Sequence, residues 1–306
     1  MTRNSHYRLI PACLLALAGF AVVGSAQGPD AASWTAHVGA AYQVTNDVVY
    51  HRATNYDLKL DVYVPRQAKG PLPAVMYFHG GGWVSRTKEY MVLNTLPYLE
   101  MGWVVVNVGY RLGSVANAPA AVEDGRCALR WVIRNAEQYR IDPTKIVITG
   151  HSAGGHLSLT TGMLPVSAGM DRQCPGNEEL KVAAIVNWLG ITDVLDILEG
   201  PNQKTYAVQW LGNQPNREEI ARKVSPINYV RPGLPPILTV HGDADPTVPY
   251  SQAVRLHQAL DRAAVANKLL TVPGGGHWRF TAEQDAKLFA QIREFLAEHG
   301  LTRVPQ

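Results

Sequence analysis

The stretch KIVITGHSAGGHL, residues 145–157, decides how the rest of the chain is interpreted. Its apolar start, KIVIT, indicates a buried strand, and Gly150-His151-Ser152-Ala153-Gly154 follows directly. This is the G-x-S-x-G pattern, in which a serine sits at a sharp turn between a strand and a helix. Glycine is required at the outer positions because side chains would collide where strand and helix approach closely. The stretch therefore predicts a nucleophilic Ser152 with its Oγ exposed.

Apolar runs alternate with helix-like segments on both sides of this turn. Solid apolar runs are typical of strands covered on both faces, as in a parallel sheet. The predicted strands are 58–64, 74–78, 103–108, 145–150, 182–188, 236–242 and 268–272, with an early strand that contains His51. The predicted helices are 87–101, 120–139, 153–163, 250–265 and 282–299. Such alternation predicts an α/β fold with a mostly parallel eight-stranded sheet and helices on both faces.

The domain organisation follows from the same pattern. We expect one catalytic domain over residues 27–306, with a loosely structured lead-in at 27–45. The irregular stretch 190–234, between two predicted strands, is the candidate for a small cap. Ligands of open α/β sheets bind at the carboxyl ends of the strands, so functional motifs are expected there.

A second motif, HGGGW at residues 79–83, directly follows the predicted strand 74–78. Three consecutive glycines allow backbone N–H groups to face a substrate oxygen without obstruction. Together with the N–H of Ala153, they predict an oxyanion hole for a tetrahedral intermediate. His79 is expected to form a hydrogen bond within this loop rather than to perform chemistry.

The serine also needs a base and a carboxylate that orients the base. His277, in GGGHW after the last predicted strand, is the candidate base. The preceding strand ends in HGDADPTVP, residues 241–249, which offers two carboxylates. We favour Asp245 because it lies further out on the loop, and Asp243 could instead cap the turn. The order serine, acid, histidine is the one used by hydrolases with this type of sheet.

Composition and the remaining motifs exclude several function classes. The chain has 306 residues, 46% of them hydrophobic, and a formal net charge of +3, which argues against a nucleic-acid partner. His151 and His156 lie five residues apart and do not face each other on a helix. The sequence contains no H-E-x-x-H motif, cysteine cluster or P-loop. We therefore expect no metal and no cofactor.

Residues 1–26 have the pattern of a cleavable signal peptide: a basic start, an apolar middle and a small-residue exit near Ala26. Its removal would take away Arg3 and Arg8 and leave 26 basic residues against 25 acidic ones. We therefore expect a secreted or periplasmic protein without a stable membrane anchor. Cys127 and Cys174 would remain, and an even pair in an oxidising compartment predicts a disulfide.

These motifs together resemble the alpha/beta-hydrolases, more narrowly the esterases and lipases with an HGGG oxyanion loop. Within these, the sequence resembles the hormone-sensitive-lipase-like and the bacterial feruloyl and acetyl-xylan esterase groups. The resemblance rests on LDVYVP at 60–65, GYRL at 109–112, GHSAGG at 150–155, SPINYV at 225–230, HGDADPTVP at 241–249 and GGGHW at 274–278. It implies that Asp245 is the acid and that Gly81, Gly82 and Ala153 supply the oxyanion amides.

The function expected from the residues and the resemblance is that of a secreted carboxylic-ester hydrolase acting on short-chain or plant-cell-wall esters. Its substrate would be a small-molecule or polysaccharide-linked ester, and Trp83, Trp188 and Trp278 are candidates for stacking on it. An amidase such as a formamidase shares the HGGGW-type loop and is the second possibility. A non-catalytic binding protein on the same fold is the third, although such proteins commonly lose one of the three catalytic residues.

Overall fold

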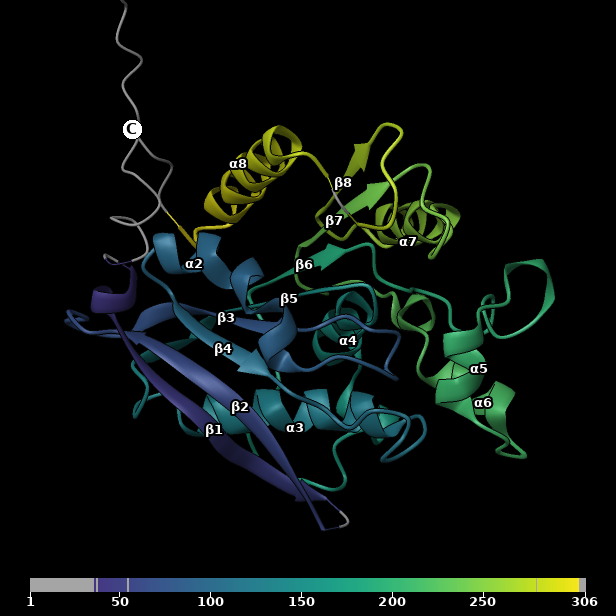
Figure 1. Ribbon diagram of the computed structural model, residues 1–306, viewed down its shortest axis with the longest axis horizontal. Coiled ribbons are helices and arrows are strands. Elements are labelled where there is room, and N and C mark those ends of the chain that lie inside the picture. The colour runs from purple at the N-terminus through teal and green to yellow at the C-terminus, as the bar shows by residue number, and fades with distance from the viewer. Residues whose placement is uncertain (1–35, 37, 54, 279, 303–306) are drawn as a thin grey trace, which may run out of the picture.

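The computed structural model describes residues 36, 38–53, 55–278 and 280–302. The predicted signal peptide, residues 1–26, lies outside the described residues. Within the described ranges, eight strands form one sheet with helices on both sides of it (Figure 1). The predicted α/β fold with a mostly parallel eight-stranded sheet is confirmed.

The bounds of the elements are as follows. The strands are β1 (Tyr42–Ala53), β2 (Tyr56–Pro65), β3 (Leu72–Phe78), β4 (Val104–Val108), β5 (Ile141–His151), β6 (Ala184–Trp188), β7 (Ile237–Gly242) and β8 (Asn267–Val272). The α-helices are α2 (Leu96–Glu100), α3 (Ala120–Arg134), α4 (Ala153–Met163), α5 (Thr205–Leu211), α6 (Arg217–Lys223), α7 (Ser251–Arg262) and α8 (Ala282–Glu298). The 3-10 helices are η1 (Lys88–Thr95), η2 (Val166–Ala168), η3 (Gly200–Asn202) and η4 (Pro226–Tyr229).

The sheet has the strand order β1-β2-β4-β3-β5-β6-β7-β8. The pairs β1–β2 and β2–β4 are antiparallel, whereas all pairs from β4 onward to β8 are parallel. The carboxyl ends of parallel strands lie at one edge of a sheet, where ligands bind in this kind of fold. The loops after β3, β5, β7 and β8 are therefore brought to a common edge.

The core lies on both faces of the sheet because successive strand residues point to opposite sides. Met76 of β3 packs in a cluster with Leu129 of α3 and Leu157 of α4. Val75, the preceding residue, packs instead in the cluster that contains Ile292 of α8. Burial of each such side chain stabilises the fold by about 1.5–3 kcal/mol. Strand β5, which carries the G-x-S-x-G turn, is held in the same way, because Ile148 packs in the first cluster and Val147 in the second.

Several bounds differ from the sequence expectation by a few residues, and three differences have a clear description. Residues 42–45 belong to β1, so the loose lead-in expected through residue 45 is wrong at its end; β1 is an edge strand whose exposed residues carry little apolar alternation. The expected helix 87–101 is divided into η1 and α2, since Met91 has non-helical angles (φ −119°, ψ 16°) and Pro97 lies in the first turn of α2. Helix α3 ends at Arg134 rather than 139.

The 190–234 segment folds as four short helices, η3, α5, α6 and η4. Figure 1 shows α5 and α6 beyond the ends of the parallel strands, at the right of the view. The catalytic motifs follow the same ends of the parallel strands. Among the described residues, no helix is long and apolar enough to cross a bilayer.

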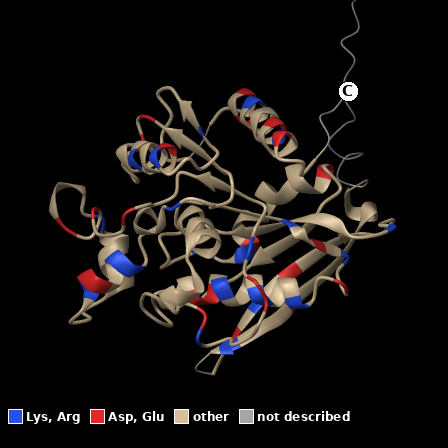
Figure 2. Cartoon of the chain, turned by 180° about the vertical axis from the view of Figure 1, so that it is seen from behind, with Lys and Arg blue, Asp and Glu red and all other residues tan. Residues whose placement is uncertain are grey.

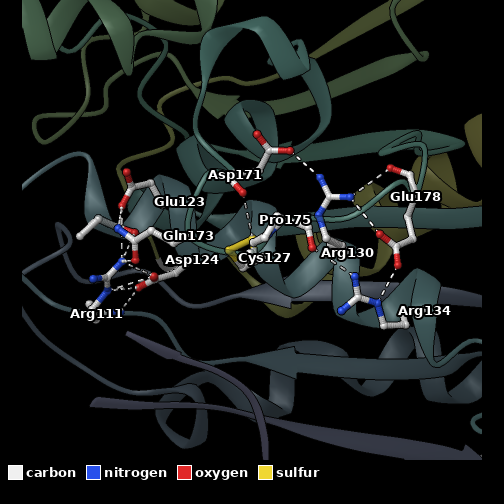
Figure 3. The surroundings of a disulfide bond; sticks show 12 residues. Arg111, Glu123, Asp124, Cys127, Arg130, Arg134, Asp171, Gln173, Pro175 and Glu178 are labelled. Atoms are coloured by element: carbon white, nitrogen blue, oxygen red, sulfur yellow. Dashed lines mark hydrogen bonds and ion pairs between the residues drawn. A yellow bond between two sulfur atoms is a disulfide. The ribbon is translucent and has the colours of Figure 1, made fainter. Parts of the chain in front are cut away.

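The disulfide predicted from the cysteine pair is present between Cys127 of α3 and Cys174, with the Cα atoms 5.6 Å apart. Figure 3 shows that ion pairs surround it. Arg130 contacts both Asp171 and Glu178, so the chain after η2 is fastened to α3 by a covalent bond and by charges.

Charged residues of both signs are interspersed along the chain (Figure 2). On α6, for example, Arg222 pairs with Glu218 and Lys223 with Glu219, each four residues apart. Exposed pairs of this kind contribute only about 0.3–0.5 kcal/mol each. These exposed charges on α6 therefore act on solubility more than on the fold.

Candidate active site

Ser152 lies at the turn between β5 and α4, with φ 58° and ψ −118°. Positive φ is uncommon for a residue with a Cβ atom and marks a strained backbone. Two backbone hydrogen bonds hold the turn: the Ser152 N–H donates to the Trp188 carbonyl at 2.8 Å, and the Ser152 carbonyl accepts from the His156 N–H at 3.0 Å. The surrounding structure thus imposes the conformation that presents the serine Oγ.

The glycines of this turn are required by the close approach of β3. A Cβ atom on Gly150 would lie 2.5 Å from the carbonyl oxygen of Phe78, and one on Gly154 would collide with the same carbonyl. The steric reason inferred from the G-x-S-x-G pattern is therefore confirmed.

Three side chains from different loops form a hydrogen-bonded chain at the edge of the sheet. His277 Nε2 lies 2.8 Å from Ser152 Oγ, and His277 Nδ1 lies 2.7 Å from Asp245 Oδ2. Because an ionised carboxylate only accepts hydrogen bonds, Nδ1 carries the proton and Nε2 is left to accept the serine hydrogen. This is the arrangement that activates a serine nucleophile.

Asp245 is held in place by four donors. Its Oδ1 accepts the N–H groups of Thr247 at 2.7 Å and Val248 at 3.0 Å, and its Oδ2 lies 3.2 Å from His241 Nε2 in addition to His277. Burial alone would raise the pKa of the Asp245 carboxyl, but the hydrogen bonds from both histidines and from Val248 outweigh it and hold the pKa below its ordinary range. The carboxylate is therefore ionised beside His277.

Asp243, the competing carboxylate, is exposed and does not reach His277. Its Oδ1 accepts the N–H of Gly274 at 2.7 Å, and its own N–H donates to the Val272 carbonyl at 3.2 Å. Asp243 thus fastens the loop after β7 to the loop that carries the histidine. The geometry favours Asp245 as the acid, whereas Asp243 stabilises the turn.

The glycine loop after β3 reaches the same edge. Gly81 and Gly82 have φ angles of 120° and 61°, which favour glycine. His79 Nδ1 lies 2.7 Å from the Gly80 carbonyl, so the expected hydrogen bond within the loop is confirmed. The His79 ring stacks on Tyr110 with 4.2 Å between centroids, and burial lowers the pKa of His79 to about 4, so the ring is neutral at pH 7.

A pocket of about 260 Å³ opens over these groups. It is lined by Gly80, Gly81, Gly82, Arg86, Ser152, Tyr206, Thr247, His277 and Trp278. Ala153, the third expected oxyanion residue, is the first residue of α4 and is fully buried beside Ser152. The structure thus brings Ser152, His277 and the two glycines to one cavity.

Sequence reasoning missed three of the lining residues, Arg86, Tyr206 and Thr247. Tyr206 comes from α5, and its hydroxyl donates to the Thr247 carbonyl at 3.2 Å. The 190–234 segment was expected to lie over the site, but nothing in its irregular sequence indicates which side chain faces the serine. Thr247 lies within the quoted HGDADPTVP stretch and could have been found there.

The three candidate tryptophans have different surroundings. Trp83 is fully buried and stacks on Trp210 with 4.1 Å between centroids. The expectation that Trp83 stacks on the substrate is wrong, because its ring has no free surface. Trp278 is 40% exposed and lines the catalytic pocket. Trp188 and Trp278 together line an adjoining pocket of about 180 Å³.

That adjoining pocket has mostly aromatic walls. Besides the two tryptophans it is lined by Asn94, His151, Leu189, Phe280, Asp285 and Phe289. His151 precedes the nucleophile and stacks on Trp188 with 4.9 Å between centroids. Burial lowers the pKa of His151 to about 3, so it is neutral. Within the described ranges, no group of three or more His, Cys, Asp or Glu side chains is placed to bind a metal ion.

The fold and the site define an alpha/beta-hydrolase with the geometry of a serine hydrolase. The chain belongs to the BD-FAE family, whose model matches residues 60–260. It is 29% identical to Esterase LipC of Mycobacterium tuberculosis in an alignment of 224 residues that covers 68% of this chain and 53% of LipC. The chain spans about half the length of the curated relatives it matches.

Solved structures of esterases share the fold over nearly their whole length. A truncated form of carbohydrate esterase from gut microbiota superposes with a TM-score of 0.71 at 30% identity, covering 85% of this chain and 97% of that one. The apo form of Thermogutta terrifontis esterase 2 gives a TM-score of 0.72 at 28% identity, covering 87% and 97%. The matched domain is therefore a serine ester hydrolase.

Proposed function

We propose that the whole protein is an exported carboxylesterase that hydrolyses short acyl esters, acetyl and feruloyl esters of plant cell walls among them, through an acyl-enzyme on Ser152. The observation that carries the proposal is the hydrogen-bonded chain from Ser152 through His277 to Asp245. Ser152 and His277 line a pocket of about 260 Å³, a size that suits a short acyl group. A Thermogutta terrifontis esterase 2 structure with propionate bound supports the same size class.

The proposed mechanism has two steps. His277 Nε2 takes the proton of Ser152 as the oxygen attacks the ester carbonyl, and the N–H groups of Gly81, Gly82 and Ala153 stabilise the oxyanion. His277 then gives its proton to the leaving alcohol, which leaves an acyl-serine. Water repeats the cycle and releases the acid, while the ionised Asp245 stabilises the imidazolium in both steps.

Two further observations support the finer points of the proposal. The aromatic walls of the adjoining pocket, with the exposed face of Trp278, suit a phenolic ring or a sugar ring, both of which stack on aromatic side chains. The Cys127–Cys174 disulfide supports export, because disulfides persist in oxidising compartments.

The test is the hydrolysis of nitrophenyl acetate, butyrate, octanoate and laurate, and of methyl ferulate. The wild type is compared with Ser152→Ala and with Ser251→Ala, an exposed serine at the start of α7. We expect turnover of acetate and ferulate that Ser152→Ala abolishes and Ser251→Ala retains. Rates that rise with chain length would contradict the short-acyl proposal. Faster cleavage of matched nitroanilides would favour an amidase.

A further inference from the structure

We propose that His156 is a positioning residue, which fastens the oxyanion loop to the 190–234 segment and thereby sets the position of the oxyanion hole. His156 lies on α4, one helical turn after Ser152, and is fully buried. The inference rests on the proposed esterase function, since it concerns the same site. It does not require any contact between His156 and the substrate.

Two hydrogen bonds place His156 between the two segments. Trp83 Nε1 lies 3.1 Å from His156 Nδ1, and His156 Nε2 lies 2.6 Å from the carbonyl oxygen of Val224, just after α6. An indole nitrogen can only donate, so Nδ1 must accept. The proton of the neutral ring is then on Nε2, where it is donated to Val224. The ring therefore links Trp83 and Val224 through one tautomer.

The protonation state required for this link is the one that burial imposes. Burial lowers the pKa of His156 to about 4, even though the hydrogen bond to the Val224 carbonyl acts in the opposite direction. The ring is thus neutral at the pH values at which a serine esterase works. A protonated ring would lose the acceptor that Trp83 requires.

Aromatic packing strengthens the same connection. The Trp83 ring stacks on Trp210 of α5, and the His156 ring stands edge-on to both, with centroid distances of 4.9 Å and 5.5 Å. Tyr206, one turn earlier on α5, covers Gly82 so closely that a Cβ atom there would lie 2.8 Å from the Tyr206 Cβ. The oxyanion loop is therefore supported from the 190–234 segment.

The oxyanion loop needs such support because its three glycines have no side chains. Gly80, Gly81 and Gly82 cannot pack, and Trp83 is the first residue after them that can. Oxyanion donors act through preorganisation, and a displacement of about 1 Å can lower the rate about a hundredfold. When the Trp83 ring is held in place, the backbone at the end of the three glycines is held as well. The N–H groups of Gly81 and Gly82 then keep their orientation.

The experiment compares His156→Phe and Trp83→Phe with the wild type. Both variants keep an aromatic ring and remove the hydrogen bond between them. The control is His257→Phe, a buried histidine on α7 that contacts Asn267 and lies outside the catalytic loops. The measurements are kcat and KM for nitrophenyl acetate and the inhibition constant of an alkyl trifluoromethyl ketone, which adds to Ser152 and places its oxygen where the oxyanion forms.

We expect kcat to fall about 10- to 100-fold in His156→Phe and several-fold in Trp83→Phe, with KM within about threefold of the wild type. Affinity for the trifluoromethyl ketone should fall by the same factor as kcat/KM. The double variant should be little worse than His156→Phe, because the hydrogen bond that Trp83→Phe removes is already lost in His156→Phe. His257→Phe should leave all three quantities near the wild-type values.

A folded His156→Phe protein whose kcat and inhibitor affinity stay within threefold of the wild type would overturn the inference, as would an equal loss in His257→Phe. If His156→Phe does not fold, Trp83→Phe, which loses the indole donor but keeps the hydrogen bond from His156 to Val224, decides the outcome by the same criteria. Absence of serine-dependent turnover in the wild type would instead refute the proposed function, so the two failures are distinguishable.

Discussion

Asp245 is an ionised carboxylate whose four donors leave it no freedom to turn away from His277. The neighbouring Asp243 has the same charge, yet it holds only the N–H of Gly274. Two chemically identical side chains two residues apart therefore have separable tasks. One orients the base and stabilises its charged form, and the other stabilises the loop that carries the base.

Exchange of each carboxylate for its amide tests this division. Asp245→Asn should lower kcat about 10⁴-fold, because an amide donor beside Nδ1 stabilises the wrong tautomer of His277. Asp243→Asn should lower kcat less than tenfold and the free energy of unfolding by about 1 kcal/mol. Steady-state rates on nitrophenyl acetate and urea unfolding of both variants provide the comparison. Equal rate losses would contradict the assignment of the acid.

At the scale of elements, the disulfide lies outside the catalytic pocket. Cys127 lies on α3, which packs against α4 and β1 among other elements, and Cys174 lies in the chain after η2. Neither cysteine lines the catalytic pocket. The covalent link should therefore affect the stability of the fold without affecting the chemistry.

Replacement of both Cys127 and Cys174 by alanine should lower the free energy of unfolding by up to about 4 kcal/mol, since the bond closes a long loop in the unfolded chain. The rate on nitrophenyl acetate at 25 °C should stay within twofold of the wild type. Urea unfolding and steady-state kinetics on the double variant measure the two effects. A large loss of kcat in folded protein would show that the link reaches the active site.

The elements also show which parts of the molecule are predictable from sequence. The β5 turn around Ser152 was predicted because strand, glycine and helix signals are all local. His277 was found because its motif follows a recognisable strand. Trp83 was misassigned, since its burial depends on Trp210, which lies 127 residues further along the chain. The polar edge strand β1 and the contacts of Tyr206 likewise depend on tertiary pairing that no local pattern records.

At the scale of the whole molecule, burial strongly lowers the pKa values of three histidines, one in the loop after β3, one at the end of β5 and one on α4. Burial lowers the pKa values of His79 and His156 to about 4 and that of His151 to about 3. Exposed in the unfolded chain, each would titrate near its ordinary value of about 6.5. Below that value the unfolded state binds protons that the folded state excludes, so stability is complete above about pH 6.5 and is lost as the pH falls toward 4.

Acidification should therefore destabilise the fold before carboxylates begin to titrate. Between pH 7.5 and 5 we expect the free energy of unfolding to fall on the order of 2 kcal/mol for each of the three histidines. Urea unfolding at pH 7.5, 6.5, 5.5 and 5 measures the slope, and His156→Phe should reduce it by about one third. A stability that stays constant over this range would contradict the neutral burial of these rings.

The central claim is that Ser152 is the nucleophile of an ester hydrolase, and covalent labelling tests it most directly. Folded wild-type protein, Ser152→Ala and Ser251→Ala are treated with an alkyl fluorophosphonate, and the adduct is located by peptide mass spectrometry. We expect one adduct on Ser152 in the wild type and in Ser251→Ala, none in Ser152→Ala, and loss of ester turnover in proportion to labelling. Turnover that persists in fully labelled protein, or an unlabelled Ser152 in folded protein, would contradict it.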